Sequence, residues 1–159
     1  MKKVKIKTEE LYQAHMILKA AKYTNMTDAD KIKAWKIARA MKPIATKYEE
    51  DQTDAANSLK PSDCNFDETY AKVQEFERLL RSGGDMTKSP IGAAEHDAFI
   101  KNVWQPYNKL VADAIKPLAD AEVEFEIEPL SEEAFGQLMG SNTNWVLDTV
   151  SFLGEIITD

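Results

Sequence analysis

The stretch Glu122-Val123-Glu124-Phe125-Glu126-Ile127-Glu128 alternates acidic and apolar residues, and Lys3-Val4-Lys5-Ile6-Lys7 alternates basic and apolar residues in the same way. A period of two is typical of a β-strand with one buried face. If the two strands pair, their apolar residues share one face and their lysines lie across from the glutamates on the other. Opposite charges across strands contribute about 0.2–1 kcal/mol per pair. We therefore predict a two-stranded sheet that joins residues 3–7 to residues 122–128, with the strand direction left open.

This strand pair also accounts for much of an uneven charge distribution. The chain has 159 residues and a formal net charge of −7. Residues 1–48 hold 12 Lys and Arg against 4 Asp and Glu, whereas residues 49–159 hold 8 against 23. Such an asymmetry can mark a partner surface, but it can equally arise from two ends that meet inside one fold. The acidic total argues against a general nucleic-acid-binding protein, which usually has a net basic domain.

Apolar residues at helical spacing predict helices for most of the remaining chain. Thr8 and Thr27 are expected to cap the first two helices, with a break at residues 25–27 and a polar connector over residues 51–61. Asn65 and Glu68 form a capping-box pattern before a third helix that Gly83-Gly84 ends. Ser89-Pro90 is expected to begin the longest helix, whose heptad-like seam Pro106 and Pro117 interrupt. This seam comprises Ile100, Trp104, Tyr107, Val111, Ala114 and Leu118.

Two helices are expected after the acidic strand. Ser131 precedes Glu132 and Glu133 at the start of a short helix that Gly140 closes. The final helix is expected over residues 143–157, where Trp145, Phe152 and Ile156 form a second apolar row beside Val146, Val150, Leu153 and Ile157. A helix that is apolar on two sides is buried centrally or forms an oligomer contact.

These patterns predict one mainly α domain over residues 1–159. We expect a bundle of about six helices with the small two-stranded sheet, and flexible segments around residues 51–64 and 82–90. No stretch approaches the roughly 20 apolar residues that span a bilayer, and the basic N-terminus is not followed by the apolar core of a secretory signal. We expect no membrane association.

Residues suited to catalysis are scarce. Cys64 is the one cysteine, and Asp63 beside it would raise rather than lower the pKa of its thiol. His15 and His96 each share a helical face with apolar residues, so a position at the edge of the core is favoured over catalysis or ligation. Glu95-His96-Asp97 resembles an acid–base cluster, but neighbouring helical residues point about 100° apart. No nucleotide-binding, hydrolase or zinc-protease motif occurs, and we predict neither an enzyme nor a metal or cofactor site.

Two charged regions remain as candidate binding surfaces. Lys33, Lys36 and Arg39 surround Trp35 on the second helix, a weak nucleic-acid signal that a solvated helix face explains more simply. Glu132 and Glu133 are the chief acids outside the sheet, and spaced carboxylates can imitate a phosphate backbone. Both regions are candidate interaction surfaces, together with Trp145, Phe152 and Ile156.

The order of elements resembles a family of small uncharacterised proteins encoded by tailed phages and prophages. The resemblance is carried by a Val-Lys-Ile-Lys strand, the lysine-rich segment 36–39, the segment 107–110, the glutamate strand and the closing segment 130–138. The family carries no established catalytic residues. The resemblance implies a phage context, with the protein in the host cytoplasm or in the virion.

Together these observations lead to two main functional hypotheses, ahead of a third in which carboxylates serve a hydrolase or metal enzyme. The first is a non-enzymatic phage accessory protein that acts through protein–protein contacts, in virion assembly or as a virion component, and that forms a homo-oligomer or a stable complex with another protein. The alternative is an acidic inhibitor of a host nucleic-acid enzyme or defence complex.

Overall fold

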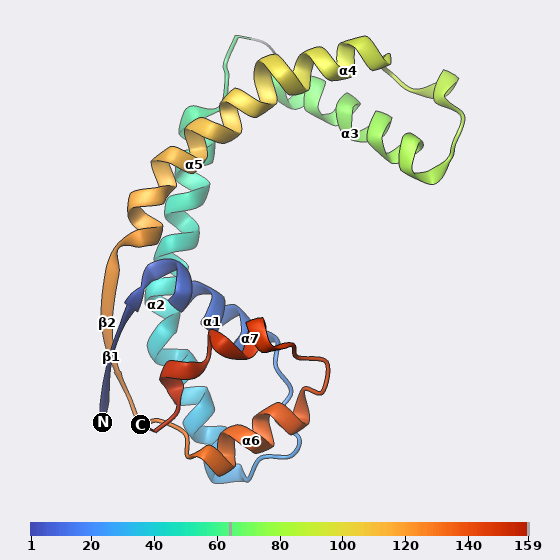
Figure 1. Cartoon of the computed structure of the whole chain (residues 1–159). Helices are drawn as coiled ribbons and strands as arrows, with labels where there is room; N and C mark the ends of the chain where they lie inside the picture. The colour runs from blue at the N-terminus through green and yellow to red at the C-terminus, as the bar shows by residue number, and fades with distance from the viewer. Residues whose placement is uncertain (64, 159) are drawn as a thin grey trace. The chain divides into compact units, whose positions relative to one another are not determined.

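The computed structural model describes residues 1–63 and 65–158; Cys64 lies outside this range. Contacts group the chain into two compact units, one of Met1–Asp51 with Lys116–Asp159 and one of Gln52–Ile115 (Figure 1). The boundaries fall inside two helices, α2 (Asp28–Leu59) and α5 (Gln105–Asp120). Each unit has its own cluster of buried side chains, a subdivision that the sequence pattern did not predict.

The predicted sheet is present in the first unit. β1 (Lys2–Lys7) pairs with β2 (Glu122–Ile127) in antiparallel direction, with Val4 opposite Phe125. Val4, Phe125 and Ile127 are buried, and their neighbours Ile6 and Val123 are half-buried. The alternating pattern therefore predicted both the strand partners and the buried face correctly.

The lysines and glutamates also meet on the outer face as predicted. Lys3 Nζ lies 3.1 Å from a carboxylate oxygen of Glu124, and Lys5 Nζ lies 3.0 Å from one of Glu122. Each lysine reaches the glutamate diagonally across the strand pair rather than the one directly opposite. Diagonal neighbours are within reach of long side chains, so the lysine strand neutralises part of the acidic strand.

The first unit also contains α1 (Thr8–Ala20), the N-terminal part of α2, the last residues of α5, α6 (Glu132–Ser141) and α7 (Leu147–Ser151). The Thr27 hydroxyl accepts a hydrogen bond from the Asp30 amide, and the Ser131 hydroxyl accepts one from the Ala134 amide, so both predicted caps are confirmed. The predicted cap by Thr8 is wrong. Thr8 is the first residue of α1, and its hydroxyl donates to the carbonyl of Ala121 at 2.8 Å, which ties the helix to the end of α5.

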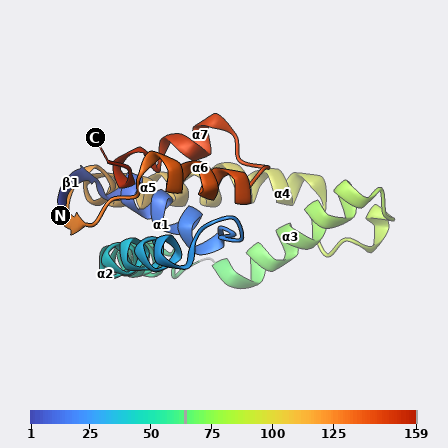
Figure 2. The same cartoon turned by 90° about the horizontal axis from the view of Figure 1, so that it is seen from below.

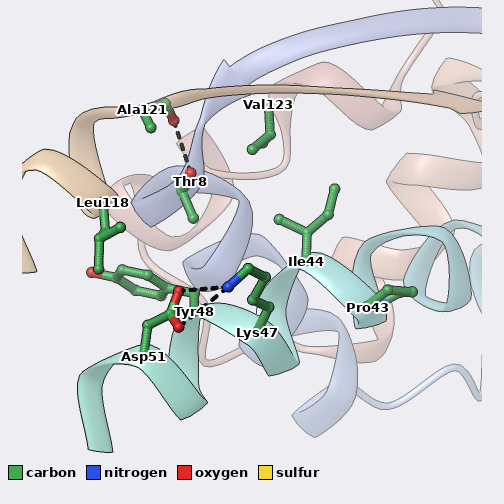
Figure 3. A pocket seen from close by; sticks show the side chains of 9 residues that line it. All are labelled: Thr8, Pro43, Ile44, Lys47, Tyr48, Asp51, Leu118, Ala121 and Val123. Carbon is green, nitrogen blue, oxygen red and sulfur yellow. Dashed lines mark hydrogen bonds and ion pairs between the residues drawn. The ribbon is translucent and has the colours of Figure 1, made fainter. Parts of the chain in front are cut away.

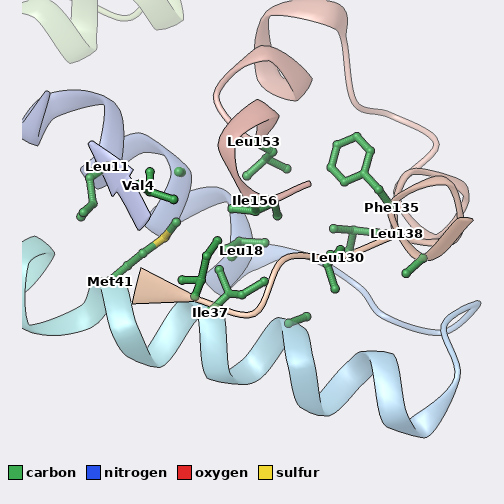
Figure 4. Close-up of a cluster of buried hydrophobic side chains, with 14 of the residues drawn as sticks. Val4, Leu11, Leu18, Ile37, Met41, Leu130, Phe135, Leu138, Leu153 and Ile156 are labelled. Carbon is green, nitrogen blue, oxygen red and sulfur yellow. The ribbon is translucent and has the colours of Figure 1, made fainter. Parts of the chain in front are cut away.

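The core of this unit lies between the sheet, α1, α2 and the C-terminal segments (Figure 4). One face of α2 contributes Ala34, Ile37 and Met41. The largest fully buried side chains of this cluster are Leu11, Leu18, Ile37, Met41, Leu130, Leu138, Leu153 and Ile156.

The predicted connector over residues 51–61 is helical for most of its length, because α2 continues to Leu59. No Gly or Pro occurs between Asp51 and Leu59, and a polar composition favours solvent exposure rather than a break in the backbone. Pro61 follows two residues after the helix end, where it prevents continuation.

The second unit contains α3 (Phe66–Ser82), the 3₁₀ turn η1 (Met86–Lys88) and α4 (Ala93–Phe99), together with the adjoining parts of α2 and α5. Gly83 ends α3 with a left-handed backbone (φ +67°), as predicted. The predicted capping box at Asn65 is wrong, since Asn65 is itself left-handed and its side chain makes no capping hydrogen bond. The next helix begins at Ala93, three residues after Pro90, so the predicted start at Ser89-Pro90 is wrong. The longest helix is α2, with 32 residues, rather than the predicted helix that follows Pro90.

A π-helical segment, η2 (Ile100–Trp104), connects α4 to α5 without a break in the chain of helical residues. The Gln105 amide donates to the carbonyl of Ile100, five residues back, directly before Pro106. Proline lacks an amide hydrogen and disturbs the preceding turn, so the predicted interruption at Pro106 is confirmed. The predicted interruption at Pro117 is wrong, because α5 continues through this residue to Asp120. Counting α4, η2 and α5 as one helix, the described residues form the predicted six helices.

The core of the second unit is an aromatic cluster. Phe66 contacts the rings of Tyr70, Phe99 and Tyr107, and Tyr70 stacks on Trp104 with ring centroids 4.8 Å apart. The Tyr107 hydroxyl donates to the carbonyl of Ala56. Of the predicted seam, Ile100, Trp104, Tyr107 and Val111 pack in this cluster, whereas Ala114 and Leu118 are exposed.

The prediction of one long final helix is wrong. Residues 143–157 form only α7 (Leu147–Ser151) and the 3₁₀ turn η3 (Gly154–Ile156). The chain then becomes extended, because the Leu130 amide donates to the Ile156 carbonyl at 2.8 Å and the Thr158 amide donates to the Leu130 carbonyl at 2.9 Å. These long-range bonds hold Leu153 and Ile156 in the core.

Candidate interaction surface

An exposed stripe runs along α2 on the side away from the core. Ile32, Trp35, Lys36 and Arg39 follow one another at helical spacing, and Ile32 and Trp35 are 54% and 57% exposed. The Arg39 guanidinium lies over the Trp35 ring, 5.1 Å from its centroid. Residues three and four apart share a face of a helix, so two large apolar side chains and two cations form one surface, which we call the α2 stripe.

Of the three basic residues predicted as a binding surface, one forms an ion pair within the fold and two belong to the α2 stripe. Lys33 lies at the margin of the core face and forms an ion pair with Glu128 at 3.2 Å. Lys36 and Arg39 are exposed and form no ion pair with any residue of the described ranges. The sequence pattern grouped all three cations, whereas in the structure Lys36 and Arg39 alone are exposed without an ion pair among the described residues.

The C-terminal candidates also divide. Ile156 is only 1% exposed, so its prediction as a contact residue is wrong. Trp145 is half-buried against the core, whereas Phe152 is 39% exposed. The most exposed apolar residues of this segment are Val146 and Leu147, at 62% and 82%. The helix expected over residues 143–157 placed Val146 in an apolar row with Leu153 and Leu147 in neither row, so it did not predict that these two residues are the exposed ones.

The acidic candidates Glu132 and Glu133 are exposed in the first turn of α6. No ion pair to them is found among residues 1–63 and 65–158. Their position at the positive end of a helix gives them a structural role as well. The predicted strand over residues 122–128 holds four other glutamates. Three of these, Glu122, Glu124 and Glu128, each form an ion pair with a lysine.

His96 occupies a distinct polar site in the second unit. Its Nε2 lies 3.0 Å from a Glu77 carboxylate oxygen, its Nδ1 lies 3.0 Å from one of Asp97, and its ring stacks on Phe76. The expectation that neighbouring His96 and Asp97 diverge is therefore wrong. The hydrogen bond to Glu77, followed by that to Asp97, raises the pKa of His96 above its ordinary value of 6.5.

This geometry predicts a pH dependence. Because the folded state binds the His96 proton more tightly than the unfolded state, its contribution is complete below pH 6.5 and is lost as the pH rises through the raised pKa. We expect at most about 1 kcal/mol, as for other exposed ion pairs. His15 has the opposite effect, since burial lowers its pKa.

The measurement is the free energy of unfolding against pH for the wild type and for His96→Gln. The difference between the two is expected to shrink as the pH rises from 6 to 9. An unchanged difference across this range would contradict the assigned pairing of His96 with Glu77.

A cavity of about 410 Å³ lies in the first unit between the start of α1, α2 and the start of β2 (Figure 3). Its wall is largely apolar, and Lys47 and Asp51 lie on one side as an ion pair at 3.2 Å. Because Asp51 already neutralises Lys47, the cavity offers no free charge to a ligand. The remaining lining residues are Thr8, Pro43, Ile44, Tyr48, Leu118, Ala121 and Val123.

Comparisons with known proteins give no assignment. No family profile matches the chain, and no curated protein or solved structure shows significant similarity to it. Among the described residues, no group of three or more His, Cys, Asp or Glu side chains is placed to hold a metal ion. Within the same residues, each helix is too short or too polar to cross a membrane.

Proposed function

We propose that the chain is a non-enzymatic accessory protein that acts through protein–protein contacts, and that the α2 stripe is a contact surface. One observation carries this proposal: Ile32 and Trp35 are more than half exposed beside Lys36 and Arg39, on a helix whose opposite face is in the core. Apolar surface left in water costs about 25 cal/mol per Å² relative to burial. A partner that covers the stripe recovers this free energy.

The composition of the stripe indicates what kind of partner it fits. Tryptophan and arginine are the residues most enriched among those that dominate binding energy in protein interfaces. Arg39 stacked on Trp35 presents a flat apolar surface with a fixed positive charge. A protein surface that combines apolar side chains with carboxylates complements both features.

The phage setting is part of the same proposal. It rests on the resemblance of the strand and helix pattern to small tailed-phage proteins, and it suggests a role in virion assembly or as a virion component. In that setting the protein would act in the host cytoplasm or in the virion.

The acidic-inhibitor alternative has less support from the charges. Glu122, Glu124 and Glu128 are paired with lysines of the same chain, so the run of glutamates is a weaker imitation of a phosphate backbone than its sequence indicates. Glu132 and Glu133 remain. The inhibitor hypothesis requires that reversing these two charges abolish inhibition of a nucleic-acid enzyme.

The proposal is tested by affinity capture from nuclease-treated lysates of the infected host. The three tagged baits are the wild type, Lys36→Glu/Arg39→Glu, and the control Lys88→Glu/Lys101→Glu. The control changes two exposed lysines by the same net charge in the second unit. We expect the wild type and the control to retain the same protein. The stripe variant should retain at least about tenfold less of it, and a tenfold loss of affinity corresponds to about 1.4 kcal/mol of binding free energy. Equal capture by all three, or capture that the nuclease abolishes, would contradict the proposal.

A further inference from the structure

The first unit carries a second exposed apolar surface, at its C-terminal end. Val146 and Leu147 are 62% and 82% exposed, and Phe152 is 39% exposed. Asp148 is also exposed and lies four residues before Phe152, on the same side of α7. We call Val146, Leu147, Asp148 and Phe152 the C-terminal patch.

The α2 stripe and the C-terminal patch are complementary in charge. Both combine large apolar side chains with charged ones, but the stripe carries Lys36 and Arg39 and the patch carries Asp148. Residues 119–159, which include the patch, hold ten acidic residues and no Lys or Arg. Five of the ten, namely Asp120, Glu122, Glu124, Glu128 and Glu155, form ion pairs with lysines of the same chain, so Asp148 is the charge that the patch itself offers. Apolar contact at the centre with opposite charges beside it is the composition that favours specific association.

The two surfaces cannot meet within one molecule. In Figure 2, α2 and α7 lie on opposite sides of the first unit, with α1 between them. Figure 4 shows the same order, with Leu18 of α1 placed between Ile37 of α2 and Leu153 near the C-terminus. The exposed side of α2 faces away from this core. A stripe therefore reaches a patch only on another molecule.

We propose that the α2 stripe of one copy docks on the C-terminal patch of a second copy, with Trp35 and Ile32 against Leu147 and Phe152 and with Arg39 beside Asp148. This inference rests on the proposed function and names the partner of the same surface. Because the two surfaces differ and lie on opposite sides, the contact is head-to-tail. Each added copy leaves one free stripe and one free patch, so the assembly is a ring or an open chain rather than a two-fold dimer.

Sedimentation velocity of the full chain over a range of concentrations tests this contact. We expect the weight-average mass of the wild type to rise beyond that of a dimer. Arg39→Asp and Asp148→Arg should each weaken association about tenfold, and Leu147→Ser should weaken it without any change of charge. The double variant Arg39→Asp/Asp148→Arg should return to within about threefold of the wild type, because it restores an opposite pair at every interface.

Lys101→Glu, an exposed position in the second unit, is the control and should associate like the wild type. A wild type that remains monomeric at all concentrations, or a double variant as weak as the single ones, would overturn the self-docking inference. If the stripe-dependent capture described above persists in that case, the stripe binds a different protein and the proposed function stands. If the capture also fails, the proposed function fails with it.

Discussion

Leu153→Ala is expected to lower the free energy of unfolding by about 2–5 kcal/mol, the range for large-to-small changes in a packed core. Leu153 is 0% exposed and packs in the cluster with Leu130, Leu138 and Ile156. Truncation removes buried methyl groups and leaves a cavity that the surrounding side chains fill only in part. Urea unfolding followed by circular dichroism measures the loss.

Leu147→Ala provides the matched control for this prediction. Leu147 lies six residues away in the same segment but is 82% exposed, so we expect a change within about 0.5 kcal/mol. Both measurements belong at a dilution at which the chain is monomeric, because association would add to apparent stability. Equal losses for Leu147 and Leu153 would contradict the observed course of the C-terminal segment and favour the continuous helix.

Asn142→Asp is expected to cost about 2–4 kcal/mol despite its nearly identical shape. Asn142 is buried, and its side-chain amide donates to the carbonyls of Lys22 and Leu138 at 2.8 and 2.9 Å. Its side-chain oxygen accepts from the Lys22 amide at 2.8 Å. A carboxylate keeps this last bond but places an oxygen against two carbonyls, and each buried polar group left without a partner costs about 1–3 kcal/mol.

Asn144→Asp is the control for Asn142→Asp, since it makes the same change of charge two residues away at an exposed position. We expect it to alter the free energy of unfolding by less than about 0.5 kcal/mol. The gap between the variants should narrow as the pH falls toward 4, because a protonated carboxyl regains a donor. Equal stability of the two variants would show that Asn142 does not connect the end of α1 to the end of α6.

Local patterns predicted the sheet because each of its two strands has one apolar face and one charged face, and the two charged faces have opposite sign. Val4 and Phe125 required one buried side, and the lysines of β1 required acidic neighbours. The direction of the strands was not predictable, because an alternating pattern is the same in both orientations. Helix boundaries were predicted correctly where a side chain caps the start of a helix, as at Thr27 and Ser131, or where a glycine ends the helix, as at Gly83.

The errors arose where long-range contacts override local propensity. The apolar spacing of residues 143–157 favours a helix, but Leu130 bonds to this segment through its own amide and carbonyl and makes it extended. No local signal marks that pairing. Likewise, the polar residues after Asp51 suggested a connector, although nothing among them stops a helix.

The candidate surface was predicted in part. The basic residues around Trp35 were visible as a cluster, but only the structure separates Lys33, which is bound to Glu128, from Lys36 and Arg39, which face solvent. Ile156 was wrongly assigned to the surface, because the direction of its side chain depends on the backbone conformation and the sequence pattern predicted a continuous helix there. The exposed Val146 and Leu147 have no sequence signal that distinguishes them from core residues.

Photo-crosslinking from position 36 tests most directly whether the α2 stripe is a protein contact surface. A photo-reactive phenylalanine analogue would replace Lys36 in the full chain, and Lys101 in a control. Irradiation inside a phage-infected host, the setting proposed for the chain, would be followed by nuclease treatment. We predict a discrete, nuclease-resistant protein adduct from position 36 and none of the same size from position 101. No adduct from position 36, the same adducts from both positions, or an adduct that nuclease removes would contradict the claim.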